Sequence, residues 1–192
     1  PFQNPSIVHK EHSFTLLSRN PHIVDYNDEV GMQVDGFYSF LEHFTLNLNY
    51  SMSSRHDAYI SKNYVPVKIE KGRPWLPSLT PERSPFWEFY FDIEYSFDEN
   101  ESYLKFGFDR RSEILYEIFA SIPEQPHRIA AIPVILQYVF CEPWSIKLIS
   151  ESEWISKFAQ EKRNYNQLIS VQVAHSPEMS VGFRYETTTG KY

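Results

Sequence analysis

The stretch Pro85-Phe-Trp-Glu-Phe-Tyr-Phe-Asp-Ile-Glu-Tyr-Ser-Phe-Asp98 decides the fold class, because its apolar and polar side chains alternate. Counting in steps of two from Trp87 gives only aromatic and aliphatic residues as far as Phe97. The positions between them are mainly acidic or polar, beginning with Glu88. A strand turns successive side chains to opposite faces, whereas a helix would scatter both kinds around its circumference. The stretch therefore predicts a β-strand with one apolar face and one charged face.

Alternation of the same kind recurs along the chain, for example at 44–51, at 104–109 and at 179–186. Helical periodicity is weak everywhere, so the pattern favours an all-β protein. It predicts nine antiparallel strands, at about 5–18, 29–40, 43–54, 85–98, 102–113, 127–141, 144–156, 164–176 and 178–188.

The predicted connections alternate between short and long. Short turns fall at Leu41–Glu42, Glu99–Glu101, Glu142–Pro143 and Pro177, and longer links fall at 19–28, 55–84, 114–126 and 157–163. Outer-membrane barrels show this asymmetry, with tight periplasmic turns and long external loops. The 55–84 segment is rich in proline, which cannot donate a ladder hydrogen bond, so we predict a long, irregular external loop and no strand pair there.

The amino-acid composition agrees with a β-sheet that has only one apolar face. Of the 192 residues, 17% are aromatic, yet only 42% are hydrophobic, and no run of about 18 apolar residues occurs. Because backbone groups in lipid must be paired within the protein, a spanning structure is a helix or a closed barrel. We therefore predict an antiparallel up-and-down transmembrane β-barrel.

We expect residues 1–192 to form a single β-barrel domain or the C-terminal fragment of a larger one. The chain begins Pro-Phe-Gln, without an initiator methionine or a signal peptide. An exported protein needs such a leader in its precursor, so the sequence is expected to be a mature or internal piece.

The ends of the apolar rows suggest which face meets lipid. Trp87 and Phe97 lie ten residues apart on one face, and so do Trp144 and Trp154. Ten residues span about 33 Å of strand, or about 25 Å of bilayer depth at a tilt of ~40°. These four residues are therefore predicted to form the lipid-facing aromatic girdle. The predicted lumen-facing residues are Glu88, Asp92, Glu94, Lys105, Asp109, Arg110, Lys147, Glu151, Glu153, Arg184 and Glu186.

Several segments resemble an uncharacterised family of outer-membrane β-barrel proteins, a domain of unknown function in Bacteroidota and related bacteria. The resemblance begins at His12-Ser-Phe-Thr-Leu-Leu-Ser-Arg-Asn-Pro21 and continues through Asn27-Asp-Glu-Val-Gly31, 44–51 and 179–186. It covers most of the chain and implies the barrel fold and an outer-membrane location. It transfers no catalytic residues, because the family has no established activity.

Motifs for other chemistry are missing from the sequence. There is no nucleophile elbow, phosphate-binding glycine loop, zinc-protease motif or dinucleotide fingerprint, so we expect no enzyme, no metal and no cofactor. The net charge of −7, without a basic run, disfavours nucleic acid. Glu88, Asp92 and Glu94 could serve a hydrolase, but lumen charges explain them more simply. The Arg110–Arg111 pair is expected to neutralise lumen acids, with an anionic lipid head group as the alternative.

The sequence thus predicts an outer-membrane barrel that serves as a pore, transporter wall or anchor. Its partners would be outer-membrane lipid and other outer-membrane proteins. The alternative is a soluble all-β module that binds carbohydrate or another ligand through exposed aromatic rings. In that case the aromatic residues should divide between a buried core and one exposed patch.

Overall fold

The computed structural model describes residues 7, 14–19, 22, 28–62, 65–69, 72, 74–99, 101–114, 126–157, 164–175 and 179–190. Ten strands are present in this part of the chain: β1 Glu29–Phe40, β2 Phe44–Arg55, β3 Ala58–Lys62, β4 Val65–Ile69, β5 Phe86–Phe97, β6 Ser102–Ile114, β7 Pro126–Cys141, β8 Trp144–Lys157, β9 Asn164–His175 and β10 Met179–Thr189. Two short 3₁₀ helices, η1 at Leu17–Arg19 and η2 at Pro81–Arg83, complete the described elements. None of the helices in these residues is long and apolar enough to cross a bilayer.

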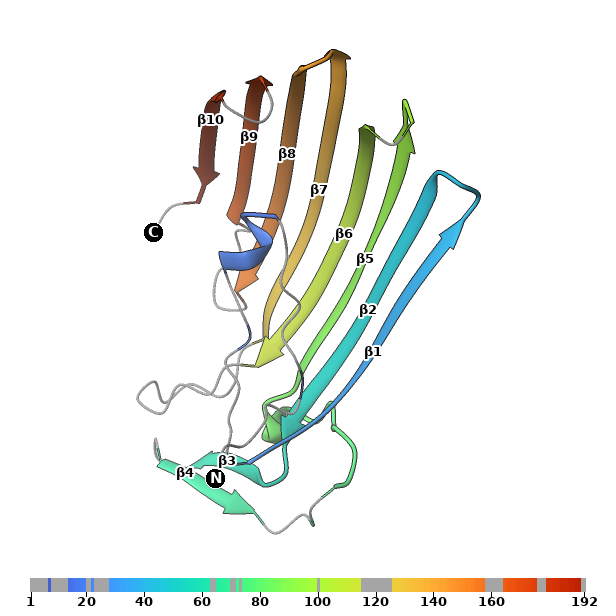
Figure 1. The fold of residues 1–192 in the computed structure, drawn as a ribbon. Coiled ribbons are helices and arrows are strands. Elements are labelled where there is room, and N and C mark those ends of the chain that lie inside the picture. Colours follow the sequence, from blue (N-terminus) through green and yellow to red (C-terminus); the bar gives the residue numbers. More distant parts are fainter. Residues whose placement is uncertain are drawn as a thin grey trace.

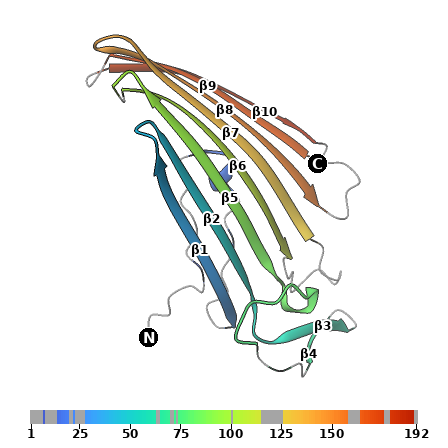
Figure 2. The same ribbon diagram turned by 90° about the vertical axis from the view of Figure 1, so that its right-hand side faces the viewer.

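Eight strands form one antiparallel sheet in the order β1-β2-β5-β6-β7-β8-β9-β10 (Figure 1). The strand ends that short turns join gather at one end of this sheet (Figure 2). The strand ends that longer connections join lie at the other end, together with the β3–β4 hairpin. The predicted all-β, antiparallel, up-and-down arrangement is therefore confirmed. The predicted sorting of short and long connections is confirmed as well.

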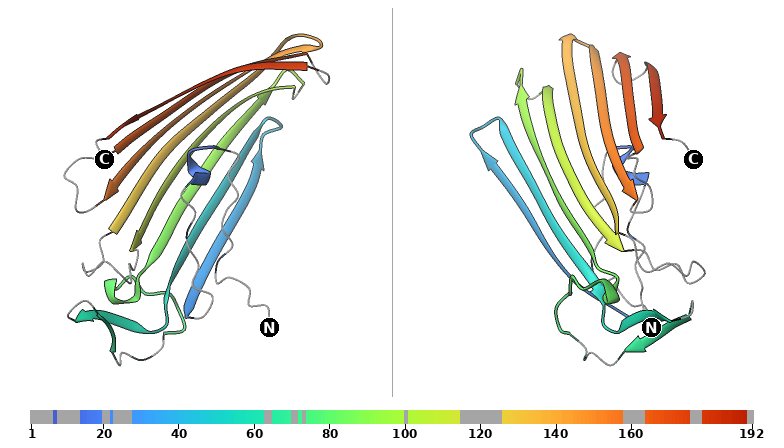
Figure 3. Two further views of the ribbon diagram at one scale, coloured as in Figure 1. Left: turned by 90° about the vertical axis from the view of Figure 1, so that its left-hand side faces the viewer. Right: turned by 180° about the vertical axis from the view of Figure 1, so that it is seen from behind.

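The sheet is not a closed barrel. Among the described strands, β1 pairs only with β2, and β10 pairs only with β9, so each forms an open edge. The sheet is long, twisted and curved (Figure 3), as expected from the right-handed twist of strands. Closure of the barrel therefore remains a prediction, whereas the strands that would form its wall are observed.

The predicted absence of a strand pair in 55–84 is wrong. β3 and β4 pair from Ala58 and Ile69 to Lys62 and Val65, and Pro66 stands opposite Ser61 within this pairing. A strand in a two-stranded sheet has a free side, where a residue without an N–H group loses no ladder hydrogen bond. The prolines of this segment therefore do not exclude strand pairing.

The predicted strand at 5–18 is also wrong over its C-terminal part. Residues 14–16 form a turn that leads into η1, and most of 5–13 lies outside the described residues. Phe14, Leu16 and Leu17 are at most 1% exposed. Two consecutive buried leucines do not fit a strand that shows one side to solvent, because neighbouring side chains point to opposite faces. We call residues 14–19 the strap, because they lie across the inner side of the curved sheet (Figure 3).

The hydrophobic core lies between the strap and the charged face of the sheet. Phe14 and Leu17 pack with Tyr90 of β5 and with Ala131 and Ile135 of β7. The apolar residues of the strap therefore bury against the face that the sequence assigned to the lumen. Burial of apolar side chains stabilises the fold by about 1.5–3 kcal/mol for each large residue.

Candidate functional site: a covered polar face and an exposed apolar face

The register of the sheet sorts the side chains into two faces. One row of opposed residues runs Asn49, Tyr90, Asp109, Ala131 and Glu153 from β2 to β8. We call this side the polar face. The other side, the apolar face, carries the rows that begin with Leu48 opposite Phe91 and Tyr50 opposite Phe89.

Exposure is the reverse of that in a soluble β-sandwich. On the polar face, Glu88 is 1% exposed and Glu153 is 0% exposed. On the apolar face, Phe89 is 37%, Leu48 is 39% and Phe183 is 68% exposed. Buried carboxylates are costly unless they are paired, and exposed aromatic rows are costly in water. The buried carboxylates of the polar face therefore need partners inside the protein, whereas the aromatic rows of the apolar face are left exposed.

Eleven residues were predicted to face the lumen, and all of them except Arg110 share the polar face. Glu88, Asp92, Asp109, Glu151 and Glu153 are buried there. Glu94, Lys105 and Lys147 are half-buried, whereas Arg184 and Glu186 on the edge strand β10 are exposed. The strap and the neighbouring strands bring the acids into contact with cations and amides.

Arg110 is the exception, and its predicted position in the lumen is wrong. It stands opposite Phe89 on the apolar face, whereas its neighbour Arg111 stands opposite Glu88 on the polar face. Successive residues of a strand cannot share a face, so the two arginines had to separate. Of the two arginines, Arg111 forms the expected ion pairs with acids, namely Glu88 and Asp109.

Arg111 lies at the centre of the first charge cluster. Its Nη1 is 4.0 Å from Oε1 of Glu88, and its Nε is 3.7 Å from Oδ2 of Asp109. Its Nη2 donates a hydrogen bond of 3.2 Å to the carbonyl of Leu17 in the strap. One buried guanidinium therefore compensates two carboxylates and holds the strap.

Asp92 lies at the centre of the second cluster. It accepts hydrogen bonds from the Tyr90 hydroxyl at 2.7 Å and from the Asn47 amide at 2.9 Å. Nζ of Lys105 is 3.7 Å from Oδ1 of Asp92 and 3.0 Å from Oε2 of Glu94. These contacts satisfy Asp92 and Glu94, two of the three carboxylates that could have served a hydrolase, so a structural role accounts for these two without a substrate.

The strap is held by the last strands of the sheet as well. The Glu151 carboxylate accepts the backbone N–H groups of Thr15 at 2.8 Å and of Leu16 at 2.6 Å. Nη2 of Arg19 donates to Oε2 of Glu186 at 2.7 Å. Arg184 donates to the Thr15 hydroxyl. The charged residues of β8 and β10 thus hold the strap in place on the polar face.

His22 ties the chain after the strap to the long-loop end of the sheet. Its Nδ1 is 2.6 Å from Oε1 of Glu113, and its Nε2 is 2.8 Å from Oε1 of Glu29. The ring also stacks on Phe86, with 4.1 Å between centroids. Burial lowers the pKa of His22, but the contacts with the Glu113 and Glu29 carboxylates outweigh it and raise the pKa to about 9. The histidine is therefore an imidazolium held between two acids at neutral pH.

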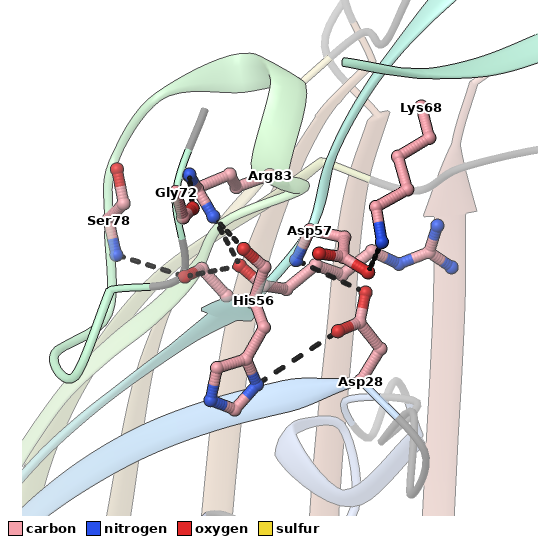
Figure 4. A network of polar contacts seen from close by, with 9 residues as sticks. Asp28, His56, Asp57, Lys68, Gly72, Ser78 and Arg83 are labelled. Atoms are coloured by element: carbon pink, nitrogen blue, oxygen red, sulfur yellow. Dashed lines mark hydrogen bonds and ion pairs between the residues drawn. The ribbon is translucent and has the colours of Figure 1, made fainter. Parts of the chain in front are cut away.

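The segment between β2 and β5 is ordered by its own polar contacts (Figure 4). The buried Arg83 donates to the carbonyls of His56 and of Gly72, the latter at 2.8 Å. The Asp28 carboxylate accepts the backbone N–H of Asp57 at 3.3 Å. These bonds join η2, the β3–β4 hairpin and the start of β1, so the long connection is fixed to the end of the sheet.

The four girdle residues all lie on the apolar face, in two groups. Trp87 is the second residue of β5 and Trp154 lies near the end of β8, so both lie toward the long loops. Phe97 ends β5 and Trp144 begins β8, so both lie toward the short turns. Rings on adjacent strands extend each group: Trp154 packs with Tyr165 at 5.4 Å between centroids, and Trp144 packs with His175 at 4.8 Å. The four residues thus form two aromatic rows on one face, and contact of these rows with lipid stays a prediction.

No family model, curated protein or solved structure matches this chain. The family resemblance of the sequence stays a prediction for that reason.

Within the described residues, no three histidine, cysteine, aspartate or glutamate side chains are grouped so as to hold a metal ion. Cys141 is a free, exposed thiol at the end of β7.

Three features of the site were not predicted from the sequence. It gave no role to Arg128, although counting back in twos from Val134 places this residue on the apolar face. It gave no role to His22, whose partners come from β1 and β6 and leave no local signal. It assigned the strap to a strand, although the adjacent Leu16 and Leu17 break the alternation.

Proposed function

We propose that this chain forms part of the wall of a bacterial outer-membrane β-barrel, with the apolar face against lipid hydrocarbon and the polar face toward the interior. The supporting observation is the inverted exposure of the sheet, with buried carboxylates on one face and exposed rings on the other. Every strand of the main sheet contributes at least one large exposed apolar residue, for example Val34, Leu48, Phe89, Phe106, Tyr138, Leu148, Ile169 and Phe183. Contiguous apolar surfaces of this extent mark contact with a membrane or a partner.

The soluble binding module is less well supported. It would keep most aromatic residues in a core and expose one patch for sugar stacking. In this chain the exposed residues follow whole strands, while the core between strap and sheet contains few rings, chiefly Phe14 and Tyr90. Lipid contact explains this distribution, whereas a single carbohydrate site does not.

Among the roles of a barrel wall, a plugged wall or anchor is better supported than an open pore. The strap covers the part of the polar face around Glu151 and Arg111, whose side chains bind its backbone. An open conduit would need water along the charges that the strap buries. The open edges of β1 and β10 would be completed by further strands or by other outer-membrane proteins, since unpaired strand edges do not occur in hydrocarbon.

Tryptophan fluorescence in vesicles tests the membrane assignment. The chain is refolded into phosphatidylcholine vesicles as single-tryptophan variants that keep Trp144, Trp154 or Trp75, the others being replaced by phenylalanine. Lipids brominated on the acyl chains should quench Trp144 and Trp154 strongly. Trp75 is 95% exposed in the long connection and serves as the control that stays unquenched. A folded monomer that remains in water beside the vesicles, with no difference among the three tryptophans, would overturn the proposal.

A further inference from the structure

Two arginines interrupt the apolar face near its long-loop end. Arg110 of β6 stands opposite Ala130 of β7, and Arg128 is two residues before Ala130 on that same strand. Both side chains are exposed. Diagonal neighbours on one face of an antiparallel pair lie about 7–8 Å apart, so the two guanidinium groups can reach one small ligand together.

Hydroxyl and indole groups surround these arginines. Arg128 stands opposite Ser112 of β6 and opposite Ser156 of β8. Trp87 stands opposite Ser112, and Trp154 stands opposite Ala130. A shallow hollow on the surface is lined by all of them: Trp87, Arg110, Ser112, Arg128, Trp154 and Ser156.

Among the acids that the structure describes, none forms an ion pair with the two arginines of this hollow. The chain carries 25 aspartate and glutamate residues and a net charge of −7. Within the described residues, neither Arg110 nor Arg128 forms an ion pair, whereas Arg111, on the opposite face, contacts Glu88 and Asp109. Two adjacent guanidinium groups without acids attract an anion, and their planar donors match the oxygens of a phosphate.

We propose that this hollow binds the phosphate of an anionic lipid head group in the outer leaflet. The inference rests on the proposed function, because it needs the apolar face to contact hydrocarbon. Trp87 and Trp154 place the hollow at the aromatic girdle, which is the depth of lipid head groups. Phe108 lines the hollow, and exposed Phe89 and Phe106 continue the apolar surface from it toward the short turns. A lipid with its phosphate on the arginines would thus lay its acyl chains along these rings, which a free phosphate ion could not do.

Native mass spectrometry of protein released from vesicles tests the site. The full chain is refolded into phosphatidylcholine vesicles that contain an acylated, bisphosphorylated glucosamine disaccharide, or the same lipid without its phosphates. We expect the phosphorylated form to be retained at least about tenfold more, since two guanidinium groups can each donate charge-assisted hydrogen bonds to the phosphate. The double variant R110Q/R128Q should lose this preference, whereas R110K/R128K should keep part of it because charge remains without the bidentate geometry.

The matched control is Lys62→Gln, which removes an exposed cation from β3, away from the hollow. It should retain the phosphorylated lipid as the unaltered chain does. Insertion with equal retention of both lipids, or an unchanged preference in R110Q/R128Q, would overturn this inference and leave the barrel wall standing. Displacement of the lipid by millimolar inorganic phosphate would overturn the lipid assignment in favour of free phosphate. Failure of the chain to enter vesicles would overturn the proposed function together with this site.

Discussion

The carboxylate of Glu151 accepts a hydrogen bond of 2.6 Å from the backbone N–H of Leu16, which lies 135 residues earlier in the chain. A helix start or turn leaves backbone N–H groups without local partners, and a carboxylate satisfies two of them here. These two hydrogen bonds join the strap to strand β8 of the sheet. Their loss therefore has a specific consequence.

Replacing Glu151 by alanine should release the strap. Two hydrogen bonds are lost, and each bond to a charged group contributes about 1.5–3 kcal/mol, so we expect a loss of about 3–6 kcal/mol of unfolding free energy. Trypsin should also cut after Arg19 faster than in the unaltered chain, because residues 14–19 open locally. Glu151→Gln keeps one acceptor oxygen and should fall between the two. Equal rates of cleavage in all three proteins would contradict the role given to Glu151.

The His22 contact should make stability depend on pH in the alkaline direction. The pKa of His22 rises from 6.5 to about 9 on folding, because Glu113 and Glu29 hold the imidazolium. A group with a raised folded pKa contributes its full stabilisation below its unfolded pKa. That contribution should therefore be complete at pH 6.5 and lost as the pH rises through about 9.

Unfolding by urea between pH 6 and pH 10 measures this effect. His22→Gln is the control, because it cannot bind a proton and should flatten the change across that window. If the unaltered chain and His22→Gln lose stability in parallel, another group carries the pH dependence.

Arg111 should be far more important for stability than its neighbour Arg110. Arg111→Met leaves Glu88 and Asp109 buried without their shared cation, and breaking a buried pair in this way costs about 3–5 kcal/mol. Arg110→Met changes an exposed residue, and in phosphatidylcholine vesicles it should alter stability by less than about 0.5 kcal/mol. Urea unfolding of the two variants checks the difference, and similar values would show that the polar face is not a charge network.

A lysine on the apolar face should oppose insertion. Phe183 stands opposite Val171, which stands opposite Leu148, midway between Trp144 and Trp154. Phe183→Lys should therefore cost about 2–4 kcal/mol of folding free energy in vesicles. Ser180→Lys, on the same strand but on the polar face and also exposed, is the matched control and should change little. Equal folding yields in vesicles would argue against lipid contact.

Gly107 marks a close approach inside the sheet. A Cβ atom at this position would lie 3.0 Å from Cγ of Pro133. We expect Gly107→Ala to destabilise the protein by about 1 kcal/mol, since overpacking costs about 1–3 kcal/mol and the reduced freedom of the unfolded chain returns about 0.4–1 kcal/mol. The double variant with Pro133→Ala removes the contact. In it, Gly107→Ala should no longer destabilise, and an unchanged cost in that background would disprove the contact.

The local pattern of the sequence was sufficient for the strands and for their faces. Period-two alternation places Phe89 and Glu88 on opposite sides whatever the rest of the chain does, because a strand has no other way to orient neighbours. The same count places Trp87, Phe97, Trp144 and Trp154 on one side. Alternation likewise places Arg110 on the side of Phe89, although its charge suggests the opposite face.

Only the tertiary structure decided how the polar face is used. The local sequence predicts that Phe14, Leu16 and Leu17 belong to a strand. Their burial against the sheet instead depends on Glu151 and Arg111, which lie more than ninety residues later in the chain. The His22 contacts and the diagonal placement of Arg110 and Arg128 on neighbouring strands likewise bring together residues that alternation alone cannot relate. Side-chain direction is a property of the local backbone, and the sequence therefore determines it. Contact between distant segments depends on register and on which buried charges find partners, so it is decided only when the whole sheet has formed.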